Sequence, residues 1–155
     1  MTKEEIITYI AEKLGKYGAT VLDYNGTKFV GIRNPYSTLD MAFAFYDEVF
    51  TAEFTYQAAR FAYEDYESAV VYAEKILNGE SVAVEIFINE QPTFGGTRPY
   101  VDFAEISDKD GFAKWYACGN EQAEVRIRGF LDGDGVSAKI FGWKGIAKRI
   151  EFRSR

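Results

Sequence analysis

Histidine is absent from this chain of 155 residues, and its absence excludes several kinds of catalytic and metal site. Without histidine there is no Ser-His-Asp triad, no Cys-His nucleophile pair and no HExxH zinc site. The one cysteine, Cys118, has no second cysteine with which to build a disulfide within the chain or a structural zinc site. Because Cys118 lies beside Gly119 at the expected end of a helix, we interpret it as a small packing residue. We therefore expect no metal and no cofactor.

Long apolar runs are also missing from the sequence. No stretch approaches the roughly 20 apolar residues that span a bilayer. The N-terminal residues, MTKEEIITYI, begin with charges and lack the apolar core and the cleavage site of a signal peptide. A chain that cannot form an internal disulfide is typical of a reducing compartment. These features predict a cytoplasmic protein that does not enter the membrane.

The residues that are present predict a folded chain. Hydrophobic residues make up 47% of the sequence and aromatic residues 17%, which is unlike the composition of a disordered protein. The length is sufficient for one hydrophobic core. No repeat, linker or low-complexity tract interrupts the chain, so we expect a single domain over residues 1–155.

Two helices and a first hairpin are indicated by local patterns. Thr2 and Glu5 have the spacing of a capping box, and apolar residues follow at helical spacing (Ile6, Ile10, Leu14, Tyr17). Asn25-Gly26 between two β-rich runs predicts a hairpin turn. Asp65 is expected to cap a second helix, whose apolar stripe consists of Tyr66, Ala69, Val70, Ala73, Ile76 and Leu77.

The segment FAFYDEVFTAEFTYQAARFAYEDYESA, residues 43–69, is unusually rich in aromatic residues. Two alternating runs surround Asp47-Glu48, which predicts two strands joined by an acidic turn. The large rings of one face are Phe43, Phe45, Phe50 and Phe54. We interpret these rings as the buried face of a sheet rather than as a stacking platform for a ligand, because each contributes much apolar burial.

The second half of the chain predicts further strands and a short third helix. Strands are expected over residues 81–89 and 100–106, with 89–100 irregular, and a helix is expected after Ser107. Alternation from Ala123 onwards predicts a C-terminal meander of three strands. The fold class is therefore α+β, with an antiparallel sheet built from hairpins and this meander, packed against two main helices and one short helix.

Charge is distributed unevenly along the chain. The net charge is −6, but the segment from Pro35 to Glu90 contains eleven acids and two bases, giving a charge of −9. From Gln122 to the C-terminus, eight bases face four acids, giving +4. An acidic segment of this kind favours a cationic partner, and the alternative is a solvated face kept charged for solubility.

The preferred functional interpretation is a non-enzymatic protein-interaction domain, such as an immunity-type or inhibitor-type protein, that binds a cationic partner. Its expected contact residues are Tyr46, Asp47, Glu48, Tyr63, Glu64 and Asp65. The alternative is a small-ligand-binding or carboxylate-using enzyme domain with a sheet-lined pocket. Its polar groups would be Glu53, Glu85 and Arg98. Enzymatic activity is the less favoured of the two.

Two other ligand classes have partial signals in the sequence. The cations Arg126, Arg128, Lys148, Arg149 and Arg153 lie near aromatic residues, as in nucleic-acid sites, but the isoelectric point of about 4.8 argues against this use. The DGDG segment at 132–135 lacks the later ligands of an EF-hand loop, so it predicts a turn.

Overall fold

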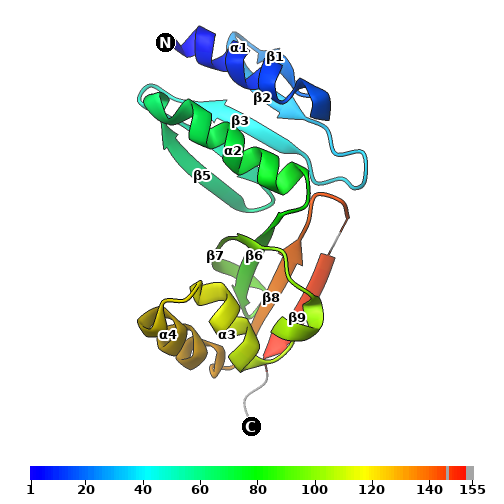
Figure 1. Ribbon diagram of the computed structural model, residues 1–155, viewed down its shortest axis with the longest axis vertical. Helices are drawn as coiled ribbons and strands as arrows, with labels where there is room; N and C mark the ends of the chain where they lie inside the picture. Colours follow the sequence, from blue (N-terminus) through cyan, green and yellow to red (C-terminus); the bar gives the residue numbers. More distant parts are fainter. Residues whose placement is uncertain (146, 153–155) are drawn as a thin grey trace. The chain divides into compact units, whose positions relative to one another are not determined.

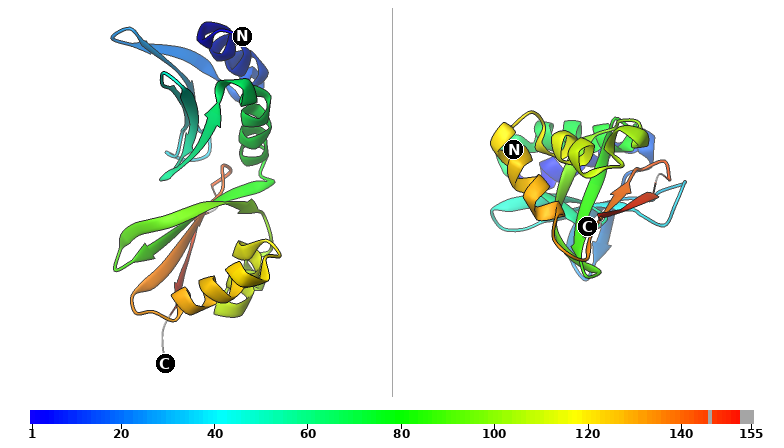
Figure 2. Two further views of the ribbon diagram at one scale, coloured as in Figure 1. Left: turned by 90° about the vertical axis from the view of Figure 1, so that its left-hand side faces the viewer. Right: turned by 90° about the horizontal axis from the view of Figure 1, so that it is seen from below.

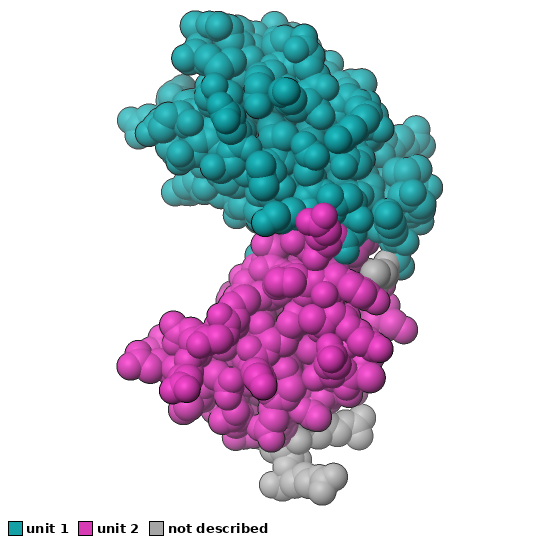
Figure 3. Space-filling view, in the orientation of Figure 1, with its two compact units in different colours: residues 1–79, 143–145 teal, residues 80–142, 146–155 magenta. Residues whose placement is uncertain are grey.

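The chain divides into two compact units in a computed structural model that describes residues 1–145 and 147–152 (Figure 3). Unit 1 comprises Met1–Gly79 and Trp143–Gly145, and the described part of unit 2 comprises Glu80–Gly142 and residues 147–152. Each unit has its own sheet and its own buried side chains. The expectation of one domain over residues 1–155 stays a prediction.

Unit 1 is a five-stranded antiparallel meander with two helices. The elements are α1 (Lys3–Lys13), a 3₁₀ turn (Gly15–Tyr17), β1 (Thr20–Tyr24), β2 (Thr27–Ile32), β3 (Met41–Phe45), β4 (Val49–Phe54), β5 (Gln57–Ala62), a second 3₁₀ turn (Tyr63–Asp65) and α2 (Tyr66–Leu77). Each strand pairs with its neighbour in sequence, in the order β1-β2-β3-β4-β5. Both helices lie on one face of the sheet (Figures 1 and 2).

Local signals account for the ends of the first elements. The Thr2 hydroxyl accepts from the Glu5 amide and the Glu5 carboxylate accepts from the Thr2 amide, which confirms the capping box of α1. Asn25 and Gly26 both have positive φ, at 52° and 84°, as a two-residue hairpin turn requires. The predicted hairpin β1–β2 is therefore confirmed.

The core of unit 1 contains the predicted phenylalanines. Phe43, Phe45, Phe50 and Phe54 are at most 6% exposed, so their interpretation as a buried sheet face is confirmed. Against them pack the apolar stripes of the two helices, which include Ile6, Ile7, Ile10, Ala69, Ala73 and Ile76. Trp143 adds a ring to this core, 5.8 Å from the ring of Phe54.

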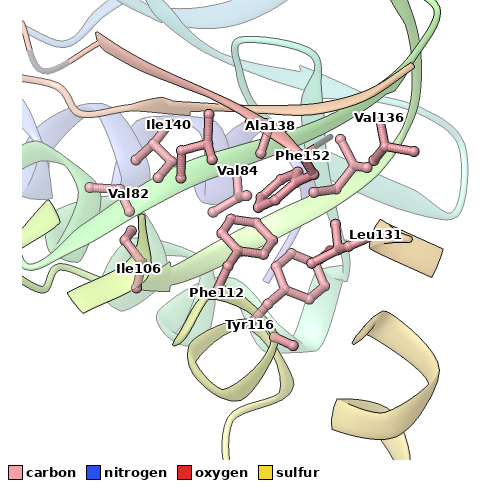
Figure 4. Packing of buried hydrophobic residues seen from close by; sticks show 13 residues of the cluster. Val82, Val84, Ile106, Phe112, Tyr116, Leu131, Val136, Ala138, Ile140 and Phe152 are labelled. Atoms are coloured by element: carbon pink, nitrogen blue, oxygen red, sulfur yellow. The ribbon is translucent and has the colours of Figure 1, made fainter. Parts of the chain in front are cut away.

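Unit 2 is a four-stranded antiparallel sheet with two helices. In the sequence, both helices lie between the second and the third strand of this sheet. Its elements are β6 (Ser81–Ile88), β7 (Gln91–Pro99), a 3₁₀ turn (Phe103–Ile106), α3 (Lys109–Ala117), α4 (Glu121–Leu131), β8 (Val136–Phe141) and β9 (Ala147–Phe152). The strand order is β7-β6-β8-β9. Phe112 of α3 lies at the centre of the core, with its ring 5.1 Å from that of Phe152 (Figure 4).

The α+β class and the antiparallel pairing are confirmed, but the first strand of the expected C-terminal meander is wrong. Residues 121–131 form α4, and only β8 and β9 remain as a hairpin. Asn120 caps α4 through the amide of Ala123, and Glu124 pairs with Arg128 one turn later. A side-chain cap and an i,i+4 ion pair favour the helix over the strand that the alternation predicts.

Three other segments differ from expectation. Residues 91–99, expected to be irregular, form β7, an edge strand that tolerates Pro92 beside a β-bulge. Residues 100–106, expected to be a strand, contain a 3₁₀ turn that Asp102 caps. The strand β5 was not expected, because its turn uses Thr55 at a φ of 62° instead of glycine or asparagine.

No helix in the ranges 1–145 and 147–152 has the length and apolarity needed to cross a bilayer.

Candidate functional site

An acidic turn joins β3 to β4 at one end of the unit 1 sheet. The amide of Tyr46 donates to the carbonyl of Val49 at 2.9 Å, which closes the turn around Asp47 and Glu48. All three turn residues are exposed, and Tyr46 keeps 53% of its surface accessible. The turn therefore presents two carboxylates and one aromatic ring to solvent.

Pairing of β4 with β5 brings a second acidic segment to this turn. Val49 at the start of β4 lies opposite Ala62 at the end of β5, so the following residues, Tyr63–Asp65, come next to the turn. The Tyr63 hydroxyl donates a hydrogen bond to the carbonyl of Tyr46. The Tyr63 ring also lies 5.7 Å from the buried ring of Phe50. We call these six residues the acidic surface: Tyr46, Asp47, Glu48, Tyr63, Glu64 and Asp65.

The acidic surface carries uncompensated negative charge. Asp47, Glu48, Glu64 and Asp65 are all exposed, and none of them forms an ion pair with any residue that the structure describes. Burial raises the pKa of the Tyr63 hydroxyl, and the nearby charge of Asp47 raises this pKa further. Tyr63 thus stays protonated and keeps its donated hydrogen bond at neutral pH.

The predicted capping role of Asp65 is wrong. Asp65 occupies the residue before α2, but its side chain makes no capping hydrogen bond. Its backbone has φ −93° and ψ 22°, because the 3₁₀ turn runs directly into the helix, whereas a capping residue is normally extended. The Asp65 carboxylate therefore makes no capping bond to α2 and contributes its charge to the acidic surface, together with Asp47, Glu48 and Glu64.

The polar groups of the alternative interpretation are not brought to one place within unit 2. Glu85 is 2% exposed. It pairs with Gly95 of β7 and Lys139 of β8, so its side chain lies on the same face of the sheet as that of Lys139. Arg98 lies opposite Val82 and faces the helices. There its Nε donates to the carbonyl of Tyr116 at 2.6 Å and its guanidinium stacks on the Tyr116 ring. Arg98 therefore fastens β7 to α3.

Glu53, the third of these groups, belongs to unit 1. It lies on the face of β4 that the helices do not cover, between Ala42 of β3 and Ala58 of β5. Its carboxylate accepts a hydrogen bond from the hydroxyl of Thr51 at 3.2 Å. Its nearest sheet neighbours thus supply no second carboxylate for acid–base chemistry.

Two of the C-terminal cations form ion pairs. Arg128 pairs with Asp110 and Glu124, and Arg149 pairs with Glu90 and Glu151. These carboxylates neutralise part of the charge that a nucleic-acid site needs. Arg153 lies outside the described residues. No cluster of three or more acidic or sulfur side chains suited to a metal occurs among residues 1–145 and 147–152.

Sequence reasoning did not identify a small pocket in unit 2. The pocket has a volume of about 150 Å³ and lies between β6, β8 and the segment 100–106. Its cation is Lys148 of β9. The pocket was missed because residues 100–106 were expected to be a strand, which would pack in the sheet instead of lying over its face.

Comparisons with known proteins give no relationship for this chain: no family model and no curated protein matches its sequence, and no solved structure matches its fold.

Proposed function

We propose that the protein is a non-enzymatic interaction domain whose acidic surface binds a cationic protein partner, as an acidic immunity-type or inhibitor-type protein does. The observation that carries this proposal is the convergence of four exposed carboxylates, none of them paired with a cation of the described chain. Such charges attract a cationic surface over roughly 8–10 Å at physiological ionic strength. The single cysteine agrees with action in a reducing compartment such as the cytoplasm.

The tyrosines of the acidic surface favour arginine over lysine in that partner. A guanidinium stacks on an aromatic ring while its N–H groups donate to carboxylates, whereas an ammonium group acts only as a point charge. Tyr46 offers an exposed ring beside Asp47 and Glu48. The Tyr63 hydroxyl donates a hydrogen bond to the carbonyl of Tyr46, which keeps the segment 63–65 beside the turn that carries the Tyr46 ring, Asp47 and Glu48.

The proposal is tested with two eight-residue peptides that alternate glycine with either arginine or lysine. In amide correlation spectra at low salt, we expect the arginine peptide to shift the signals of residues 46–48 and 63–65. We expect the lysine peptide to bind these residues more weakly. Binding of both peptides should weaken as salt is raised from about 50 to 500 mM, because the Debye length shortens.

Charge removal at the acidic surface tests which carboxylates are used. The variant Asp47→Asn, Glu48→Gln, Glu64→Gln, Asp65→Asn changes the net charge from −6 to −2. We expect it to weaken the arginine peptide at least about tenfold, since each exposed ion pair contributes a few tenths of a kcal/mol to 1 kcal/mol.

A matched control changes the net charge by the same amount at other positions. Four exposed acids outside the acidic surface are replaced together: Glu12→Gln, Glu105→Gln, Glu121→Gln and Asp134→Asn. This control should bind the arginine peptide nearly as well as the unaltered protein. Equal weakening by the two variants, or binding that does not respond to salt, would show that the acidic surface is not the interaction site.

A further inference from the structure

The small pocket of unit 2 has an apolar floor that belongs to the sheet and its covering turn. Val82 of β6, Ile140 of β8 and Ile106 of the 3₁₀ turn lie together at one end of the core cluster (Figure 4). All three are at most 4% exposed overall. The part of the pocket that they form therefore offers a ligand no polar group.

The walls of the pocket include the aromatic ring of Trp115, which is fixed in position. The indole N–H of Trp115 donates to the carbonyl of Pro99 at 2.8 Å, which holds the ring of α3 against the end of β7. Val101 and Phe103 also line the pocket, from the segment that follows β7. Both of these side chains are only half-buried, so one side of the pocket remains accessible.

The polar side chains that line the pocket are Lys148 and Tyr100, and both are exposed. Lys148 lies opposite Ile140 in the β8–β9 pairing, so its side chain projects from the same face of the sheet as the pocket floor. Its ammonium group is 5.5 Å from the centre of the Phe103 ring. Lys148 forms no ion pair within the described parts of the chain.

We propose that this pocket binds a small carboxylate whose apolar part is the size of a benzene ring. The volume of about 150 Å³ is that of an apolar cavity that admits benzene. The ring of the ligand lies against Val82, Ile106 and Ile140, and its carboxylate meets the ammonium group of Lys148. An amine of the same shape binds more weakly, because the charge of Lys148 repels it.

The probes are benzoate, benzyl alcohol and benzylamine, which share one ring and differ in charge. In correlation spectra of the full chain, benzoate should shift the indole N–H signal of Trp115 and the methyl signals of Val82 and Ile140. Lys148→Ala should weaken benzoate roughly two- to fivefold, as expected for one exposed ion pair, and leave benzyl alcohol unchanged. Lys75→Ala, an exposed lysine on α2 of unit 1, is the matched control and should have no effect.

A second variant tests the pocket itself. Val101→Phe replaces a half-buried side chain in the segment after β7, and its larger ring should occupy the pocket and abolish binding of both benzoate and benzyl alcohol. The proposal is overturned if no probe shifts the Trp115 signal, or if Lys148→Ala binds benzoate as well as before. The pocket belongs to unit 2 and the acidic surface to unit 1, so the two proposals are tested by separate variants.

Discussion

At the scale of single residues, Tyr63 connects the two segments of the acidic surface. Its hydroxyl donates to the carbonyl of Tyr46, and its ring packs on Phe50. Tyr63→Phe keeps the ring and removes the donor, so we expect the free energy of unfolding to fall by about 1 kcal/mol. Urea denaturation followed by circular dichroism measures this change. An unaltered midpoint would mean that water replaces the hydroxyl without loss.

The same residue predicts a dependence on alkaline pH. Because the folded state raises the pKa of Tyr63, the unfolded chain loses this proton first, at about pH 10. The stability that Tyr63 contributes is therefore complete below that pH and declines above it. The difference in unfolding free energy between the unaltered protein and Tyr63→Phe should be constant from about pH 7 to 9 and should shrink above about pH 10.

At the scale of elements, glycines in α3 and α4 predict opposite effects of the same substitution. A β-carbon at Gly129 of α4 would meet nothing within 4 Å. Gly129→Ala should therefore stabilise the protein by about 0.5–1 kcal/mol, because alanine loses less backbone entropy in a helix. A β-carbon at Gly111 of α3 would lie 2.2 Å from the carbonyl oxygen of Glu105. Gly111→Ala should destabilise the protein by on the order of 2–3 kcal/mol.

Thermal denaturation of the two variants separates these effects. Gly129→Ala should raise the melting temperature, and Gly111→Ala should lower it because the 3₁₀ turn must move away from α3. A lower melting temperature for Gly129→Ala would argue against α4.

At the scale of the whole molecule, the chain leaves unit 2 after Gly142, contributes residues 143–145 to unit 1 and then returns. Trp143 is 2% exposed, and its carbonyl accepts from the side-chain amide of Asn34 at 2.9 Å. Unit 1 thus includes a segment that the chain connects to β8 on one side and to β9 on the other. We therefore expect the two units to unfold in one cooperative transition.

The two tryptophans report on this transition separately, because Trp115 belongs to unit 2 and Trp143 to unit 1. In a urea series on one sample, the folded-state indole N–H signals of both should disappear with the same midpoint. Trp115→Phe assigns the two signals. Distinct midpoints would show that the units unfold independently and would refute the expectation of one domain.

Much of the fold follows from patterns that are short in sequence. The capping box at Thr2 and Glu5 and the turn at Asn25-Gly26 involve groups that are close in sequence, so they form without contacts from distant segments. The alternation around Asp47-Glu48 was sufficient to assign the buried phenylalanines. For α4, two local patterns disagreed, and the cap at Asn120 and the Glu124–Arg128 pair would have identified the helix.

By itself, the sequence determined which side chains are available, which chemistries the lack of histidine excludes, and which faces are apolar. Only the tertiary structure decided which of these side chains meet. Strand pairing brought Tyr63–Asp65 to the turn at residues 46–48, directed Arg98 and Glu85 to opposite faces of one sheet, and placed Lys148 at an apolar pocket. Register and burial depend on contacts between distant segments, and a change of one residue in register turns every side chain of a strand to the other face.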